Sequence, residues 1–372
     1  MRRRDFLCAT ATTGIVVACR AKRGEPFPGY AFVANYEAKT VAVVDLTAFS
    51  VTRQIRLDDG PTGLAMHPSK GLVYVLTPAS GFVHEIDTAK MAVVRKVRAV
   101  SSAVSMRFSA ADDTPALWVL GTDRRLARVD VDTFHVAGSI GLPGQGTDFD
   151  LSNWTKLAAV GYADSGTATL IDLRTGNVGK PVRVSDAVGA VRFRSDGKML
   201  IVADTAGRAL SLLQAPGGRL VSRLMLAVRP DNLCFSTDNG GQLFVTGDGA
   251  DAVVVVYPFK VPEVAETALA GRAPGPMAAS KSFLFVANPG AGDVSIFDIA
   301  THKTIAVAAV GAEPRYIVIT PDDQFALVLN EKSGDVAVIK MLAIRNDRTK
   351  AAALFTMIPV GSKPVAAVVR AV

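Results

Sequence analysis

One phrase recurs eight times along this chain of 372 residues, at a nearly constant spacing. Each copy is an apolar run, a short break rich in Gly, Asn or Asp, and a second apolar run; residues 32–46 (FVANYEAKTVAVVDL) and 285–299 (FVANPGAGDVSIFDI) are the clearest pair. Such a phrase predicts two antiparallel strands joined by a tight turn. The copies begin at Tyr30, Leu72, Ala116, Leu157, Met199, Gln242, Phe283 and Phe325, which are 42, 44, 41, 42, 43, 41 and 42 residues apart.

A period in the low forties that contains strand patterns throughout is typical of a β-propeller. After each phrase comes a third strand, as in residues 50–56, and then a Gly or Pro break before a short apolar strand, as in residues 315–319. One such unit cannot bury both of its faces, so the units must stack around an axis until a ring closes. The sequence therefore predicts an all-β propeller of four-stranded blades, with eight blades favoured by the count and seven as the alternative.

The two ends of the chain predict how this ring closes. The first propeller strand, near Tyr30, has the pattern of a second strand, whereas residues 364–369 (PVAAVV) have the pattern of an inner strand. The last strand should therefore complete the first blade. A closed ring also makes residues 30–372 one domain, although the length alone would allow two.

The first eighteen residues have the pattern of a signal peptide. An arginine-rich start precedes a short apolar run over residues 6–18, which is too short to cross a bilayer. Arg3 and Arg4 resemble the twin-arginine export motif, and the sequence VVAC that ends at Cys19 resembles a bacterial lipobox. These resemblances imply a protein exported to the cell envelope or periplasm, lipidated at Cys19, and tethered to a membrane through residues 19–29. An ordinary signal peptide with an incidental cysteine is the alternative.

The unit over residues 283–323 resembles the YVTN-type repeat of exported bacterial propellers, the YncE-like group. The resemblance extends over the chain from about Tyr30 onward. Its motif is specific for the fold but gives almost no information on a reaction or a ligand. That family is often described as seven-bladed, whereas eight repeat starts occur here.

The charge distribution argues against nucleic-acid binding, and the cysteine content argues against a disulfide in the mature chain. Of the formal net charge of +7, the N-terminal residues Arg2, Arg3, Arg4 and Asp5 contribute +2, and the remaining excess is scattered. Nucleic-acid binding, which needs a basic stripe, is therefore not expected. Once a signal segment with a lipidated cysteine is accounted for, Cys234 has no partner for a disulfide, and we expect a buried, inert thiol on an inner strand.

Catalytic and metal-binding motifs are absent from the sequence. It contains no C-x-x-C-H and no G-x-S-x-G segment. The four histidines, His67, His84, His135 and His302, lie in different repeats without a second ligand at metal spacing, so solvated histidines are expected. No metal, cofactor or catalytic residue is predicted.

Candidate binding residues follow from the geometry of a propeller. One loop from every blade gathers at the mouth of the axial channel, where ligand sites usually form. Residues just after the Gly or Pro break should begin the inner strands and face the axis. Polar side chains stand out there at Asp148, Asp231 and Arg315, with Arg229 and Asn232 beside them; Arg272, Glu313 and Lys363 are nearby. The alternative is that these groups cap strand ends in solvent.

The leading functional hypothesis is an exported, membrane-tethered, non-catalytic monomer that binds an unidentified protein or small molecule at the channel mouth. Two other hypotheses remain open. The first is an enzyme similar to lactonases or quinone-dependent dehydrogenases, and the second is a haem-binding propeller similar to that of periplasmic nitrite reductases. An enzyme needs a general base or a metal ligand near the mouth, and haem needs a histidine there. None of the four histidines is obviously so placed.

Overall fold

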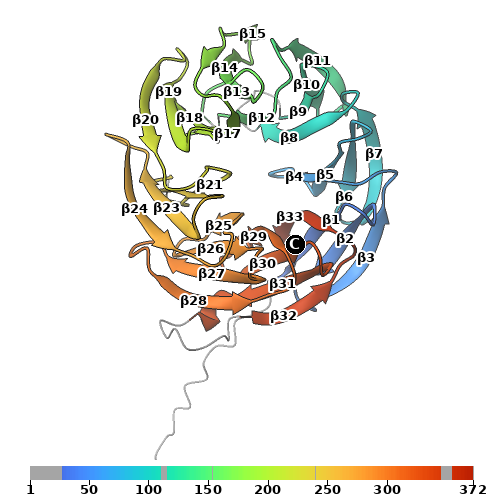
Figure 1. The fold of residues 1–372 in the computed structure, drawn as a ribbon. Helices are drawn as coiled ribbons and strands as arrows, with labels where there is room; N and C mark the ends of the chain where they lie inside the picture. The colour runs from blue at the N-terminus through green and yellow to red at the C-terminus, as the bar shows by residue number, and fades with distance from the viewer. Residues whose placement is uncertain (1–26, 110–114, 153, 239, 345–353, 372) are drawn as a thin grey trace, which may run out of the picture.

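The computed structural model describes residues 27–109, 115–152, 154–238, 240–344 and 354–371. Their strands form eight antiparallel sheets set radially around a central axis (Figure 1). The prediction of an eight-bladed propeller is confirmed, and the seven-bladed alternative is wrong. Each blade has four strands except blade 4, whose outer strand is divided in two.

Blades 1 to 8 are numbered from the one that contains β1. The inner strands are β33 (Pro364–Ala371), β4 (Gly63–Met66), β8 (Ala103–Ser109), β12 (Asp148–Leu151), β17 (Val188–Phe193), β21 (Asn232–Phe235), β25 (Met277–Ala279) and β29 (Pro314–Ile319). The second strands are β1 (Gly29–Asn35), β5 (Leu72–Thr77), β9 (Ala116–Gly121), β13 (Leu157–Tyr162), β18 (Met199–Asp204), β22 (Leu243–Thr246), β26 (Phe283–Asn288) and β30 (Phe325–Asn330). The third strands are β2 (Thr40–Asp45), β6 (Phe82–Asp87), β10 (Arg125–Asp130), β14 (Thr167–Asp172), β19 (Ala209–Gln214), β23 (Ala252–Tyr257), β27 (Asp293–Asp298) and β31 (Asp335–Lys340). The outer strands are β3 (Ser50–Arg56), β7 (Ala92–Arg98), β11 (His135–Gly141), β15 (Asn177–Val178) with β16 (Val182–Arg183), β20 (Leu220–Met225), β24 (Glu263–Leu269), β28 (Thr304–Ala309) and β32 (Leu354–Pro359).

The last strand closes the ring as predicted. β33 pairs antiparallel with β1, from Gly29 opposite Ala371 to Ala34 opposite Ala366. The first and last parts of the described chain therefore share blade 1, and its sheet has the order β3-β2-β1-β33.

The hydrophobic core lies between neighbouring blades. Second and third strands are buried along their length, whereas outer strands expose many of their side chains. One core cluster joins Val33 and Val44 of blade 1 to Leu327 and Val338 of blade 8. Cys234 lies on inner strand β21 as expected, and burial raises the pKa of its thiol to about 12, so the thiol stays protonated near neutral pH.

Antiparallel connection places successive loops on alternate faces of the ring. We call the mouth face the one formed by the second-to-third and outer-to-inner loops, such as residues 247–251 and 270–276. We call the terminal face the one formed by the inner-to-second and third-to-outer loops, such as residues 152–156 and 258–262. Phe27, just before β1, and Ala371, at the end of β33, both lie on the terminal face.

The predicted signal segment over residues 1–18, with Arg3 and Arg4, and Cys19 lie outside the described residues. Phe27 is 3% exposed and packs in the core of blades 1 and 8, so the folded ring begins slightly before Tyr30. Among the described residues, no helix has the length and apolar character to span a membrane.

Candidate ligand-binding site at the channel mouth

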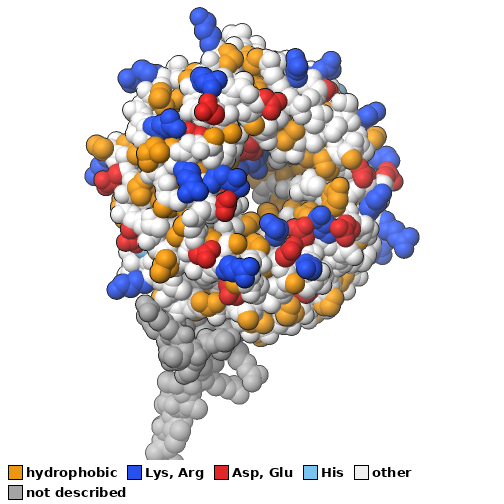
Figure 2. All heavy atoms as spheres, viewed as in Figure 1, with side chains coloured by type: hydrophobic (Ala, Val, Ile, Leu, Met, Phe, Trp, Pro, Cys, Tyr) orange, Lys and Arg blue, Asp and Glu red, His pale blue; other side chains and the backbone are white. Residues whose placement is uncertain are grey.

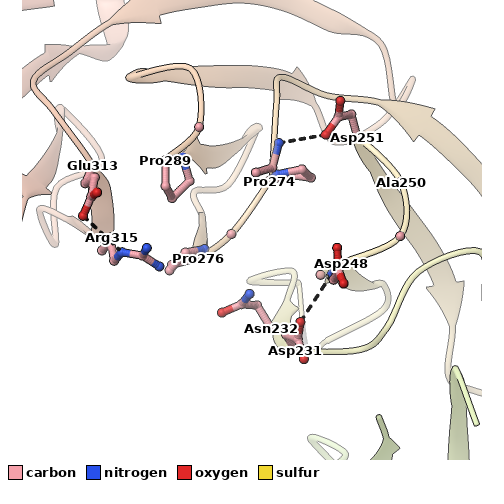
Figure 3. Close-up of a pocket in the computed structure, with 15 residues that line it drawn as sticks. Asp231, Asn232, Asp248, Ala250, Asp251, Pro274, Pro276, Pro289, Glu313 and Arg315 are labelled. Carbon is pink, nitrogen blue, oxygen red and sulfur yellow. Dashed lines mark hydrogen bonds and ion pairs between the residues drawn. The ribbon is translucent and has the colours of Figure 1, made fainter. Parts of the chain in front are cut away.

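A cavity of about 770 Å³ opens on the mouth face where blades 6, 7 and 8 meet (Figure 3). It is formed by the second-to-third loops at residues 247–251 and 289–290, the outer-to-inner loop at residues 273–276, and the first residues of two inner strands. In the space-filling view, acidic and basic side chains surround a hollow near the centre of the ring (Figure 2).

Two glycines allow the loops of this cavity to approach one another. A Cβ added to Gly247 would lie 1.7 Å from the carbonyl oxygen of Arg229, so the loop could not pack there with a larger residue. Gly249 has a φ of +110°, and a Cβ there would meet the Arg208 guanidinium at 2.8 Å. The sequence GDGADA therefore folds as a tight turn that places two aspartates at the cavity.

The cavity is lined by more negative than positive groups. Its charged lining residues are Asp231, Asp248, Asp251, Glu313 and Arg315, which is four carboxylates against one guanidinium. The guanidinium is half exposed, and its Nε lies 3.6 Å from a carboxylate oxygen of Glu331 and 4.0 Å from one of Glu313.

Two of the carboxylates also hold the loops in place. Oδ1 of Asp251 accepts a hydrogen bond of 2.8 Å from the backbone N–H of Ala273. Oδ2 of Asp231 accepts from the Asp248 backbone N–H at 3.3 Å and from Nε of Arg229 at 3.1 Å. The exposed carboxylate of Asp248 and the amide of Asn232 add polar groups to the lining of the cavity.

The structure brings together four of the five predicted binding residues. Asp231, Asn232 and Arg315 line the cavity, and Arg229 lies beside it through its ion pair with Asp231. Sequence reasoning missed Asp248 and Asp251, because it considered the residues at the starts of inner strands and not the second-to-third loops. Two aspartates in one glycine-rich turn were the available signal.

Asp148, the fifth predicted residue, lies elsewhere, in a polar clasp between β12 and β17. Its Oδ2 accepts from the Val191 backbone N–H at 3.0 Å and pairs with the Arg192 guanidinium. On the same strand, Oδ2 of Asp150 accepts from the Phe193 backbone N–H at 2.8 Å. Burial raises the pKa of Asp150, although Arg192 acts in the opposite direction. These two carboxylates therefore accept hydrogen bonds from backbone N–H groups of β17, the inner strand of the next blade.

The prediction of solvated histidines is wrong for three of the four. His67 and His84 are each 3% exposed, and the His302 side chain is 10% exposed, whereas His135 is exposed. The physical reason is that each buried ring has a local polar partner. Nε2 of His84 lies 3.2 Å from Oγ1 of Thr77, and Nδ1 of His302 lies 2.6 Å from a carboxylate oxygen of Glu266.

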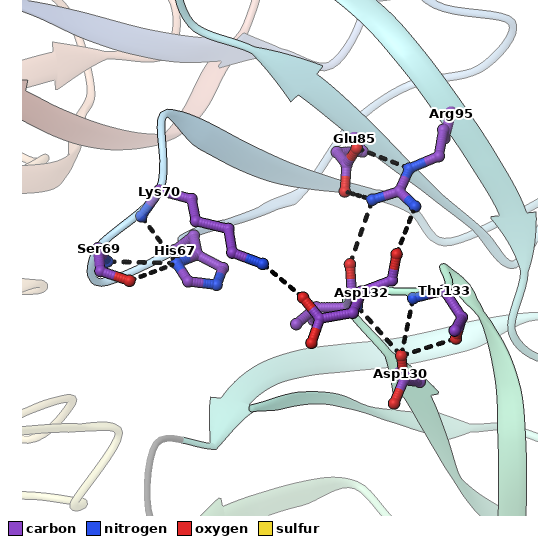
Figure 4. Close-up of polar contacts among 9 residues, drawn as sticks. His67, Ser69, Lys70, Glu85, Arg95, Asp130, Asp132 and Thr133 are labelled. Carbon is purple, nitrogen blue, oxygen red and sulfur yellow. Dashed lines mark hydrogen bonds and ion pairs between the residues drawn. The ribbon is translucent and has the colours of Figure 1, made fainter. Parts of the chain in front are cut away.

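His67 organises a turn on the terminal face (Figure 4). Its Nδ1 accepts from the backbone N–H groups of Ser69 at 3.2 Å and Lys70 at 3.0 Å. Close by, Arg95 donates to both oxygens of the buried Glu85 in the same blade, at 2.8 and 2.6 Å. It also donates to the carbonyl oxygens of Asp132 at 2.8 Å and Val131 at 3.2 Å, which fastens blade 2 to blade 3. None of the four histidines lines the channel-mouth cavity.

The comparisons with known proteins agree on a propeller. A family model described as "Lactonase, 7-bladed beta-propeller" matches residues 260–362, from just before β24 to just after β32. No curated protein sequence matches the chain significantly.

Among solved structures, the dihydro-heme d1 dehydrogenase NirN in complex with DHE is similar with a TM-score of 0.73 and 15% identity, over 93% of this chain and 76% of that one. Apo AztD from Citrobacter koseri is similar with a TM-score of 0.69 and 13% identity, over 92% and 98% of the two chains. Hydrazine synthase from Kuenenia stuttgartiensis has a TM-score of 0.58 and 16% identity, over 77% and 99%. At these identities the likeness shows the fold alone.

Proposed function

We propose that this protein is a non-catalytic binding propeller that captures a positively charged ligand at its channel mouth. The observation that carries the proposal is the cavity of about 770 Å³ lined by four carboxylates and one guanidinium. Cavities of this size hold small molecules, and charge complementarity favours an amine or a basic side chain over an anion. The ligand class is therefore a polyamine, a basic amino acid or a basic peptide segment.

The test measures the binding of spermidine and arginine by calorimetry to the parent protein and to Asp248→Asn with Glu313→Gln. Loss of charge-assisted contacts worth about 1.5–3 kcal/mol each should weaken binding about tenfold or more. Asp186→Asn is the matched control, because Asp186 lies on the mouth face outside the cavity and is 83% exposed. Equal binding by all three proteins would contradict the proposal.

Arg315→Gln separates two kinds of ligand. A purely cationic ligand should bind more tightly once the guanidinium is removed, since the cavity then has no positive charge of its own to repel it. A ligand that also carries a carboxylate should bind less tightly, because it loses its ion pair.

We also propose that the chain is an exported, lipid-tethered member of the YVTN-repeat, YncE-like propellers. The motifs at Arg3, Arg4 and Cys19 and the repeat pattern support this proposal. Mass spectrometry should find a diacylglyceryl group on Cys19 of the parent, and Cys19→Ala should make the protein extractable from the membrane fraction by alkaline, high-salt washing without detergent. An unmodified Cys19 in membrane-bound parent protein would overturn the assignment.

A second candidate is a lactonase-type hydrolase, which the family-model match over residues 260–362 favours. In this cavity a carboxylate such as Asp248 would have to serve as the general base. Hydrolysis of simple lactones that disappears in Asp248→Asn would support this candidate. NirN is described in complex with DHE, but no histidine lines the present cavity, so its residues do not fit an axial haem ligand and no haem is proposed.

A further inference from the structure

Three large apolar side chains project from the terminal face. Trp154 is 76% exposed, Val261 is 80% exposed and Leu342 is 68% exposed. Trp154 lies between β12 and β13 of blade 4, Val261 between β23 and β24 of blade 6, and Leu342 in the 3-10 helix η1 (Met341–Ala343) of blade 8. Their loops all belong to the terminal face, so they lie on one side of the ring while belonging to three different blades.

Two of these side chains stand on turns that are held by hydrogen bonds or core packing. Oγ of Ser152 accepts from the backbone N–H groups of Trp154 at 3.4 Å and Thr155 at 3.1 Å. In η1, Met341 is 6% exposed and packs in the core of blades 7 and 8, whereas the next residue, Leu342, points outward. Little conformational entropy remains to be lost at these turns when they dock.

The loop that carries Val261 is fastened to the neighbouring blade. The Arg194 guanidinium donates to the carbonyl oxygen of Pro258 at 2.8 Å and lies 4.5 Å from the centre of the Phe259 ring. An apolar side chain so exposed on a fastened loop is not a poorly packed core residue. It is held out where a partner surface can cover it.

A lysine lies within two residues of each apolar side chain: Lys156, Lys260 and Lys340. Aromatic and aliphatic side chains flanked by lysines are typical of protein surfaces that lie in the headgroup region of a bilayer. On such surfaces apolar side chains enter the boundary of the acyl chains, and lysines interact with lipid phosphates.

The path of the chain indicates the same occupant. Phe27 is buried on the terminal face, so residues 1–26, with their apolar run over residues 6–18, connect to the ring on this side. The three side chains belong to three separate blades, and a lipid surface is flat and extended, so it can meet all three.

We propose that the terminal face rests on a phospholipid membrane through Trp154, Val261 and Leu342, with the channel-mouth cavity turned away from the bilayer. The interaction goes beyond the proposed ligand binding and does not require lipidation of Cys19. It fixes the orientation of the ring, which a flexible tether alone would leave free.

The experiment uses the full chain with Cys19→Ala, which has no lipid anchor, and vesicles of equal parts phosphatidylcholine and phosphatidylglycerol. In a flotation assay this protein should rise with the vesicles. Adding Trp154→Ser, Val261→Ser and Leu342→Ser should reduce the bound fraction at least about tenfold, because the inserted apolar area is lost. The control adds Met225→Ser and Leu269→Ser instead; these side chains are 65% and 81% exposed at the mouth-facing ends of outer strands, and binding should not change.

Fluorescence gives a second readout in the unsubstituted Cys19→Ala protein. The other tryptophan, Trp118, is 3% exposed, so changes on vesicle addition report on Trp154. Its emission should shift to the blue and be quenched by lipids brominated on the acyl chains.

Three outcomes would overturn the proposal: flotation of the triple-serine variant like its parent, an equal loss in the mouth-side control, or Trp154 emission that vesicles do not change. A doubled mass in light scattering that only the triple substitution abolishes would assign the face to a second copy of this chain instead. Amine binding by the same variants is measured separately, so failure of membrane docking and failure of the proposed ligand site are distinguishable.

Discussion

Burial favours the neutral form of His67 and His84 in the folded ring. Burial lowers the pKa of both imidazoles. Lys70 acts in the same direction on His67, whereas on His84 the Asp58 carboxylate opposes burial and Lys96 adds to it. Protonation of His67 at Nδ1 would also remove the acceptor for two backbone N–H groups. Both residues therefore couple folding to pH.

We expect stability to fall as the pH drops from about 7 to about 5. The folded-state pKa of each histidine lies below its unfolded value of about 6.5, so the unfolded chain binds the proton first. The stabilisation is complete above the unfolded pKa and is lost as the pH falls through the folded pKa. Calorimetric melting of His84→Gln should show a shallower dependence than the parent over this range. His135→Gln, at an exposed position, should leave the slope unchanged; an unchanged slope in His84→Gln would contradict the assignment.

At the scale of elements, blade 4 differs from the other blades in its outer strand, and side chains of its inner strand β12 hydrogen-bond to β17 of the next blade. The outer strand of this blade is reduced to β15 and β16, with two residues each. Gly179 and Pro181 both lie between these two strands and account for the break, because proline has no N–H for a ladder and glycine favours irregular backbone. The carboxylates of Asp148 and Asp150 instead fasten the inner end of the blade to its neighbour.

Asp148→Ala should lower the free energy of unfolding by about 1–3 kcal/mol, because it leaves the Arg192 guanidinium and the Val191 N–H without their shared acceptor. Binding of spermidine should not change. Asp231→Ala should do the reverse, with weaker binding and a smaller loss of stability, since Asp231 lies in the cavity and its Arg229 partner is 48% exposed. Denaturant unfolding and calorimetry together check both outcomes, and a stable Asp148→Ala protein that loses binding would reverse our assignment.

Asp148 and Asp231 show which part of the site could be predicted from the sequence and which could not. Both occupy the same place in their repeats, and periodicity correctly puts each at or next to the start of an inner strand. What differs is the neighbour: Asp148 meets Arg192 from the next blade, and Asp231 meets an open cavity. Contacts between blades involve residues about forty positions apart that carry no repeat signal, so the clasp at Asp148 could not be derived from spacing. Spacing also does not report burial or loop packing, so the buried histidines and the cavity carboxylates Asp248 and Asp251 were not predicted.

At the scale of the molecule, the spacing of the repeats was sufficient to predict the architecture. Strand patterns and turn residues are local, and the number of repeats is a covalent property of the chain, so both the blade count and the closure by residues 364–369 could be predicted. The ring constrains each blade to two neighbours, which leaves few ways to arrange eight of them.

Deletion of residues 364–372 should abolish cooperative unfolding or cause aggregation, because β1 would lose its inner partner and expose an unpaired edge in the channel. Removal of Val372 alone is the control and should have little effect, since the pairing with β1 ends at Ala371. Circular dichroism melting and light scattering give the readouts. A truncated protein that melts like the full-length chain would show that the closure contributes little.

The pairing of β33 with β1 also sets an order in time. Synthesis proceeds at about 5–20 residues per second, so a ribosome needs roughly 20–75 s for 372 residues. During this interval β1, among the first strands to be made, has no inner partner, because β33 is made more than 300 residues later. The first blade therefore stays open until residues 364–371 have been synthesised, although seven complete sets of strands precede them.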